Sequence, residues 1–178
     1  MADNKTKVKN LLRYSEVLKH LPRTGWLQKG IEQPESVAAH SWQMALLALF
    51  LSSEEDSGYD FDRVIKLCLC HDMAESKIGD ITPTDGAYSL KASAEKAAMA
   101  EIAAAADFPA LNALWQEYEA GQTPEARLAR DLDKLDMYAQ SLDYEQKFPG
   151  KDLSEFRRSA ATAIKTDLGK KLLAEIVK

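Results

Sequence analysis

The sequence contains no apolar run long enough to cross a bilayer, and its first residues lack the apolar core of a signal peptide. We therefore expect a cytoplasmic protein without a membrane partner. The net charge is −5, and Lys and Arg are scattered rather than gathered into the basic stripe of a protein that binds duplex DNA. A nucleic-acid polymer is thus not an expected partner, whereas small-molecule substrates remain open.

Cysteine is scarce. Cys68 and Cys70 are the only two, and on a helix their side chains would point roughly 200° apart. They are therefore expected neither to form a disulfide nor to chelate a metal together. We predict buried thiols that pack as small hydrophobic groups.

Strand-like alternation, internal repeats, low-complexity segments and interior linkers are also missing. The 178 residues, 46% of them hydrophobic, suffice for one domain with a sizeable core. Because apolar residues recur at helical spacing through most of the chain, the sequence predicts an all-α fold and a single domain over residues 1–178. Its chemically distinctive part spans about 22–144, and closing helices occupy 151–178.

Capping signals delimit several of these helices. Ser36 is typical of an N-cap, and Thr123 followed by Pro124 is typical of a helix start. The segments 22–30 and 81–86, which contain glycine and proline, are expected to be loops. Helices are predicted at 7–21, 37–53, 62–70 and onward, 89–106, 109–120 and 124–142, and in the closing segment.

The sequence around His71 is the most distinctive. On a helix, His71 and Asp72 project from neighbouring faces, and Glu75 returns to the side that they share. The preceding segment is apolar, which predicts that the pair is buried, and a buried imidazole beside a carboxylate needs a partner. A divalent cation such as Mn²⁺, Co²⁺, Fe²⁺ or Mg²⁺ would supply one. The alternative is a His-Asp pair satisfied within the core, and the dipeptide alone does not decide.

Three other candidate residues lie outside that segment. Arg23 offers a planar fork for a phosphate or carboxylate, and Trp26 offers a flat face for a base or sugar. Their alternatives are a surface arginine and a tryptophan that packs on the core. His40, in the second turn of its predicted helix, is either a core histidine or a ligand that reaches toward a neighbouring helix.

Three aspartates lie along the predicted helix 124–142. Asp131 lies on the flank of the apolar stripe, whereas Asp133 lies farther round the helix. Periodicity alone therefore selects Asp131 over Asp133 and Asp136. The apolar stripe consists of Leu128, Leu132, Leu135 and Ala139.

Five segments, in this order and at this spacing, resemble the HD-domain phosphohydrolases, specifically the 5′-deoxynucleotidase group. The resemblance extends from about Arg23 to Tyr144 and implies a helical bundle with a metal site between its helices. The segments are Pro22–Trp26, Glu35–Val37 with His40, His71–Glu75, Gly79–Ile81 and Leu132–Met137.

The resemblance also implies a ligand set for one divalent metal ion, such as Mn²⁺, Co²⁺ or Mg²⁺. In that set Asp133 takes the place of Asp131, which periodicity selects. The implied ligands are His40, His71, Asp72 and Asp133.

Further roles follow from the resemblance. Glu75 and Asp80 resemble catalytic carboxylates, and with the carbonyl of Ile81 they are the implied ligands of a second metal ion. Arg23 resembles a phosphate-binding arginine, although in some relatives this arginine directly precedes the tryptophan and here two residues intervene. We expect Trp26 to contact the 2′ edge of a sugar, where it would disfavour a hydroxyl group.

The implied activity is metal-dependent hydrolysis of deoxyribonucleoside 5′-monophosphates to deoxyribonucleosides and phosphate. No serine, cysteine or aspartate nucleophile motif occurs in the sequence, which favours direct attack by water. Two alternatives stay open: hydrolysis of another nucleotide (a triphosphate, a cyclic nucleotide or a guanosine polyphosphate), and a non-catalytic module that binds metal and nucleotide. We expect a homodimer.

Overall fold

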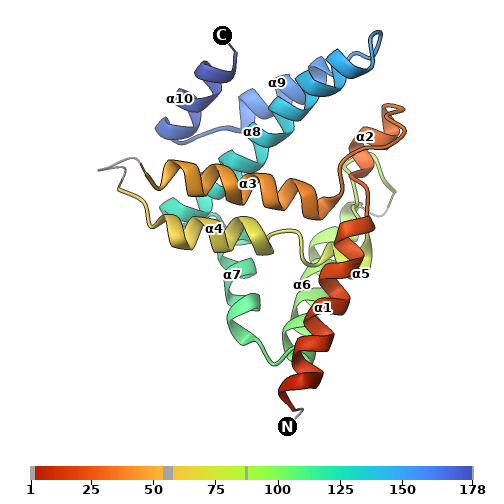
Figure 1. Cartoon of the computed structure of the whole chain (residues 1–178), viewed down its shortest axis with the longest axis vertical. Coiled ribbons are helices and arrows are strands. Elements are labelled where there is room, and N and C mark those ends of the chain that lie inside the picture. Colours follow the sequence, from red (N-terminus) through yellow and green to blue (C-terminus); the bar gives the residue numbers. More distant parts are fainter. Residues whose placement is uncertain (1–2, 54–57, 87, 178) are drawn as a thin grey trace. The chain divides into compact units, whose positions relative to one another are not determined.

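The computed structural model describes residues 3–53, 58–86 and 88–177, and over these residues the chain is helical without a single strand. The predicted all-α fold is confirmed (Figure 1). Within the described part, no helix is both long and apolar enough to cross a membrane. The elements are α1 (Asn4–His20), α2 (Thr24–Gln28), α3 (Val37–Leu51), α4 (Phe61–Cys70), α5 (Glu75–Ile78), the 3₁₀-helix η1 (Tyr88–Leu90), α6 (Lys91–Ala105), α7 (Pro109–Ala120), α8 (Pro124–Lys147), α9 (Ser154–Ala163) and α10 (Asp167–Ile176).

The capping signals act as the sequence predicts. The Ser36 hydroxyl accepts a hydrogen bond from the Ala39 amide at 3.1 Å in the first turn of α3. The Thr123 hydroxyl likewise accepts from the Ala126 amide at 3.1 Å, which caps α8. Gly121 ends α7 with a φ of 60°, a conformation that favours glycine.

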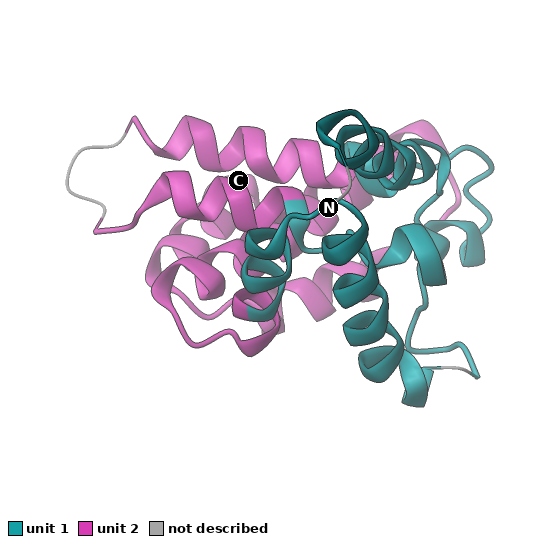
Figure 2. Cartoon of the chain, turned by 90° about the horizontal axis from the view of Figure 1, so that it is seen from below, with its two compact units in different colours: residues 1–39, 70–116 teal, residues 40–69, 117–178 magenta. Residues whose placement is uncertain are grey.

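The chain divides into two compact units, each made of two separate stretches: unit 1 is residues 1–39 and 70–116, and unit 2 is residues 40–69 and 117–178 (Figure 2). In unit 1, α1 packs against α5 and α6, and the Asn10 amide donates to the Ala105 carbonyl at 2.7 Å. In unit 2, α9 and α10 pack against α8. The expectation of a single domain stays a prediction.

The structure differs from the predicted elements at two places near the distinctive segments. The expected loop 22–30 contains the short helix α2. A hydrogen bond from the Arg23 amide to the Glu35 carbonyl at 3.0 Å joins the residue before α2 to the segment before α3. Moreover, α4 ends at Cys70, so that His71 and Asp72 lie in turns between α4 and α5 rather than within a continuous helix.

Candidate metal and phosphate site

In unit 1, His71 and Asp72 are held by consecutive turns. The Met73 amide donates to the Cys70 carbonyl at 3.2 Å, and the Glu75 amide donates to the Asp72 carbonyl at 3.0 Å. The His71 ring is buried, and its Nε2 lies 3.0 Å from Asp72 Oδ2. Two ligand atoms that each lie about 2.1 Å from one octahedral ion are about 3 Å apart. The pair therefore has the spacing of two ligands that share one cation.

Arg23 lies beside this pair. Its Nη1 is 3.3 Å from Asp72 Oδ2, and both side chains are largely buried. Arg23 directly precedes α2 as its N-cap residue, so the start of that helix fixes the position of the Arg23 backbone. The structure thus brings the predicted phosphate-binding fork to the predicted metal-binding carboxylate.

Glu75 opens α5 and is only 3% exposed. Its Oε2 is buried and has no hydrogen-bond partner among the described residues. Burial, together with the negative charges of Asp72 and Asp80, raises the pKa of Glu75 to about 10, against the opposing effect of Lys91 and Arg23. Such a carboxyl group favours its ionised form only when further positive charge is nearby, which fits a bound divalent cation.

Asp80 follows Gly79, which ends α5 with a φ of 80°. Its Oδ2 accepts a hydrogen bond from the Thr24 amide at 2.6 Å, and its backbone carbonyl accepts from the Thr24 hydroxyl at 2.7 Å. One carboxylate oxygen of Asp80 is therefore used to join the loop after α5 to the start of α2.

Lys91 is a residue of this site that the sequence does not reveal. By helical periodicity it belongs on a solvent face of α6, yet its side chain is only 24% exposed. Its ammonium donates to the Ile81 carbonyl at 3.0 Å and lies 3.7 Å from Glu75 Oε1. Burial by itself would lower the pKa of Lys91, but the surrounding carboxylates, Glu75 and Glu95 foremost, outweigh it and raise the pKa.

Unit 2 contains a second imidazole and carboxylate pair. His40 is fully buried near the start of α3, and its Nδ1 lies 2.6 Å from Asp136 Oδ2 on α8. An ionised carboxylate only accepts hydrogen bonds, so Nδ1 donates to Asp136, and Nε2 is the ring nitrogen left for another partner. This Nε2 lies 3.3 Å from Asp133 Oδ1. A carboxylate behind the ring of a histidine is the usual support of a metal ligand.

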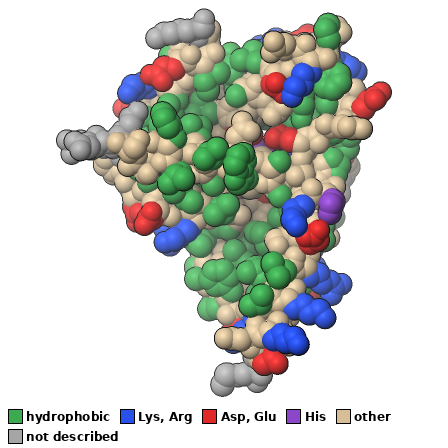
Figure 3. Space-filling view, in the orientation of Figure 1, with side chains coloured by type: hydrophobic (Ala, Val, Ile, Leu, Met, Phe, Trp, Pro, Cys, Tyr) green, Lys and Arg blue, Asp and Glu red, His purple; other side chains and the backbone are tan. Residues whose placement is uncertain are grey.

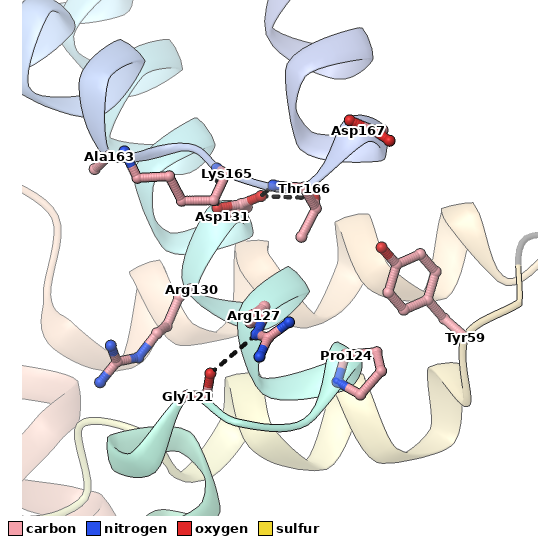
Figure 4. Close-up of a pocket in the computed structure, with 10 residues that line it drawn as sticks. All are labelled: Tyr59, Gly121, Pro124, Arg127, Arg130, Asp131, Ala163, Lys165, Thr166 and Asp167. Carbon is pink, nitrogen blue, oxygen red and sulfur yellow. Dashed lines mark hydrogen bonds between the residues drawn. The ribbon is translucent and has the colours of Figure 1, made fainter.

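Asp131, which periodicity selects as the metal-binding aspartate, has a different role. Its carboxylate accepts hydrogen bonds from the Lys165 amide at 2.9 Å, from the Thr166 amide at 2.7 Å and from the Thr166 hydroxyl at 2.6 Å (Figure 4). These bonds join α8 to the turn before α10. Both carboxylate oxygens of Asp131 are thus engaged with the segment before α10, which favours Asp133 as the metal ligand; that assignment stays a prediction.

The pocket drawn in Figure 4 is lined by Asp131 and by basic side chains of unit 2. Its arginines are engaged with the backbone: Arg127 Nε donates to the Gly121 carbonyl at 3.2 Å, and Arg130 Nε donates to the Tyr118 carbonyl at 2.9 Å. These contacts stabilise the connection between α7 and α8.

Trp26 is only 2% exposed, and its indole Nε1 donates to Glu35 Oε1 at 3.0 Å. Little of the ring is therefore exposed to a sugar, and the expected direct sugar contact stays a prediction. The alternative, a tryptophan in the core, describes its position. The sequence also does not reveal that Glu35 is the partner of this indole, because next to Ser36 it resembles an ordinary residue of a helix start.

Comparisons with known proteins agree with these features. A model of the HD domain family matches residues 15–176. A 5′-deoxynucleotidase from Schizosaccharomyces pombe is 41% identical over 78% of this chain and 73% of its own length. A 5′-deoxynucleotidase from Xenopus laevis is 40% identical over 88% of this chain and 81% of its own.

Solved structures with the same fold are also known. A protein from Pyrococcus horikoshii matches with a TM-score of 0.81 and 34% identity, covering 96% of this chain and 95% of its own. A protein from Magnetospirillum magnetotacticum, described as a predicted metal-dependent phosphohydrolase, matches with a TM-score of 0.67 and 27% identity over 97% of this chain and 93% of its own.

Proposed function

The chain belongs to the HD domain family, in the group of the 5′-deoxynucleotidases, and we propose on that premise that it is a divalent-metal-dependent phosphomonoesterase that hydrolyses deoxyribonucleoside 5′-monophosphates. The products are a deoxyribonucleoside and phosphate. The observation that carries this proposal is the spacing of imidazole nitrogen and carboxylate oxygen within each unit, 3.0 Å from His71 to Asp72 and 3.3 Å from His40 to Asp133.

His40, His71, Asp72 and Asp133 are the proposed metal ligands. The order of the motifs in the family and the distances within each pair support this assignment. A mixed set of imidazole and carboxylate ligands suits Mn²⁺ or Co²⁺. Such an ion, when bound, lowers the pKa of a water molecule and polarises a phosphoryl oxygen.

The remaining groups bind the phosphate, transfer protons and hold the loop after α5 in place. Arg23 binds the non-bridging oxygens, where a guanidinium neutralises the charge of the transition state. Glu75 accepts the proton of the attacking water through Oε2, the oxygen that has no other partner among the described residues. As the new bond between oxygen and phosphorus forms, the bond from phosphorus to O5′ breaks, and O5′ takes up the proton that Glu75 received from the water. Asp80 holds the loop in place through Thr24.

The selectivity for deoxyribose is assigned to the segment around α2, with an indirect role for Trp26. The Trp26 indole donates a hydrogen bond to Glu35 and is buried within unit 1, which holds α2 in position. Arg23 directly precedes that helix. A 2′-hydroxyl that is buried without a partner costs about 1–3 kcal/mol, equivalent to about 10- to 100-fold in kcat/KM.

The proposal is tested by phosphate release from dAMP, dTMP, AMP and dATP after dialysis against EDTA and addition of Mn²⁺, Co²⁺ or Mg²⁺. We expect no release in EDTA, recovery with Mn²⁺ or Co²⁺, and a preference for the two deoxynucleoside monophosphates. Full activity in excess EDTA would remove the metal from the mechanism. Faster hydrolysis of dATP or AMP would assign the protein to another substrate within the family.

We further propose that two copies of the chain pair through α3. Four large apolar side chains on one face of this helix are exposed, and hydrophobic side chains gather over α3 in Figure 3. Because α3 contains no Asp, Glu, Lys or Arg, its exposed apolar face can pack against the same face of a second copy. Light scattering should give the mass of a dimer, and Phe50→Glu should give that of a monomer. The four residues are Trp42, Leu46, Leu49 and Phe50.

A further inference from the structure

Lys91 lies where the family resemblance implies a second metal ion. That ion would use Glu75, Asp80 and the Ile81 carbonyl as ligands. In the structure, the Lys91 ammonium already donates to the Ile81 carbonyl at 3.0 Å and lies 3.7 Å from Glu75 Oε1. Glu95, one turn further along α6, also pairs with this ammonium at 3.5 Å.

The Lys91 ammonium and a second divalent ion cannot both bind beside Glu75 and the Ile81 carbonyl. A divalent metal binds oxygen ligands at about 2.1–2.4 Å. An ion coordinated by both the Ile81 carbonyl and Glu75 Oε1 would therefore lie within a few ångströms of Lys91 Nζ, where two like charges repel strongly in a partly buried setting. In addition, Asp80 Oδ2 already accepts the Thr24 amide at 2.6 Å and has less capacity for a metal.

We propose that Lys91 supplies the second cation of the active site, so that the protein binds one divalent ion per chain instead of two. Lys91 acts through Glu75 and is a positioning residue. By holding Oε1, it leaves Oε2 as the oxygen that faces the chemistry. This inference rests on the proposed function, because it assigns a role within the same metal-dependent site.

The experiment counts metal ions. The wild-type protein and three variants are dialysed to equilibrium against excess Mn²⁺, and the bound Mn²⁺ is measured by metal analysis. Lys91→Met removes the charge but keeps the length of the side chain, whereas Lys91→Arg keeps the charge. Lys96→Met is the matched control, because Lys96 lies on the same helix and is exposed. We expect about one ion per chain in wild type, Lys91→Arg and Lys96→Met, and about two in Lys91→Met, where the ammonium no longer excludes the ion.

Turnover gives a second reading. At one equivalent of Mn²⁺, Lys91→Met should be slower by about 10-fold or more, the range of losing a group that supports a metal site. Excess Mn²⁺ should restore it, because a second ion then replaces the ammonium. Two ions in wild type, or one ion in Lys91→Met, would overturn the inference and leave the proposed activity intact. No bound ion in wild type would overturn the metal-dependent function itself.

Discussion

Each unit of the molecule brings one imidazole and two carboxylates together, but the two units use the second carboxylate differently. In unit 2, Asp136 accepts from His40 Nδ1 at 2.6 Å and so fixes the ring that faces Asp133. In unit 1, Glu75 Oε2 has no hydrogen-bond partner among the described residues. In the proposed mechanism, the same kind of side chain therefore orients a ligand in one unit and accepts a proton in the other.

The two pairs also differ in how the backbone builds them. His71 and Asp72 are neighbours in the turns after α4, so local hydrogen bonds set their spacing. His40 and Asp133 come from α3 and α8, and their distance depends on how these helices pack within unit 2. Substitutions that affect ligand binding, ligand orientation and proton transfer separately can test these different roles of the two units.

The largest effect is expected for His71→Ala. Loss of a proposed ligand should lower the affinity for Mn²⁺ by at least about 100-fold, beyond the range seen when only a supporting group is lost. Metal analysis after dialysis and phosphate release from dAMP measure it. His20→Ala is the control, because His20 is 78% exposed and pairs with Glu16. If His71→Ala retained its metal, the pair in unit 1 would not be a ligand pair.

Glu75→Gln should keep its metal and lose turnover by about 10²-fold or more, the scale of losing a general base. An amide of the same shape cannot take the proton, and additional Mn²⁺ should not restore the rate. Glu101→Gln on α6 serves as the control, since the Glu101 carboxylate is exposed and pairs with Lys77. Wild-type turnover in Glu75→Gln would return this carboxylate to a structural role.

Most of the fold could be predicted from the sequence, because its determinants are local. The hydroxyl groups of Ser36 and Thr123 cap helices by accepting a hydrogen bond from the backbone amide three residues further on. Such caps depend on the local sequence alone. The short helix α2 was missed, because a segment with glycine and proline is typical of a loop. Its conformation is stabilised by tertiary contacts, such as the bond from Trp26 to Glu35.

The site was harder to predict, because it depends on contacts between elements. Periodicity favours Asp131 over Asp133, but α8 buries both residues, and only the neighbouring segments give them different partners. The family resemblance selected Asp133. Helical periodicity alone puts Lys91 on a solvent face, because the sequence does not show that the start of α6 lies beside Glu75 and the Ile81 carbonyl.

Asp136→Asn should have an intermediate effect. It removes the negative charge behind His40, and we expect the affinity for Mn²⁺ to fall by about 10- to 100-fold. The rate should recover in excess Mn²⁺, in contrast to that of Glu75→Gln. A titration of activity with Mn²⁺ compares the two variants directly. If metal rescued Glu75→Gln but not Asp136→Asn, the roles assigned to the two carboxylates would have to be exchanged.

The smallest effect on activity is expected for Asp131→Asn. The amide keeps one acceptor for the three donors of Lys165 and Thr166, so the free energy of unfolding should fall by about 1–3 kcal/mol. For a protein of this size, that lowers the melting temperature by about 2–4 °C per kcal/mol. Turnover and bound metal should not change, because this carboxylate faces α10 and not His40.

Asp133→Asn is the matched comparison, since it makes the same substitution two residues further along α8. It should lose metal and leave the melting temperature of the metal-free protein close to that of wild type, because Asp133 faces His40 Nε2 and Lys134 rather than the backbone amides before α10. Thermal unfolding in EDTA and metal analysis give the two readings. Loss of metal in Asp131→Asn with retention in Asp133→Asn would show that periodicity, and not the family resemblance, had identified the ligand.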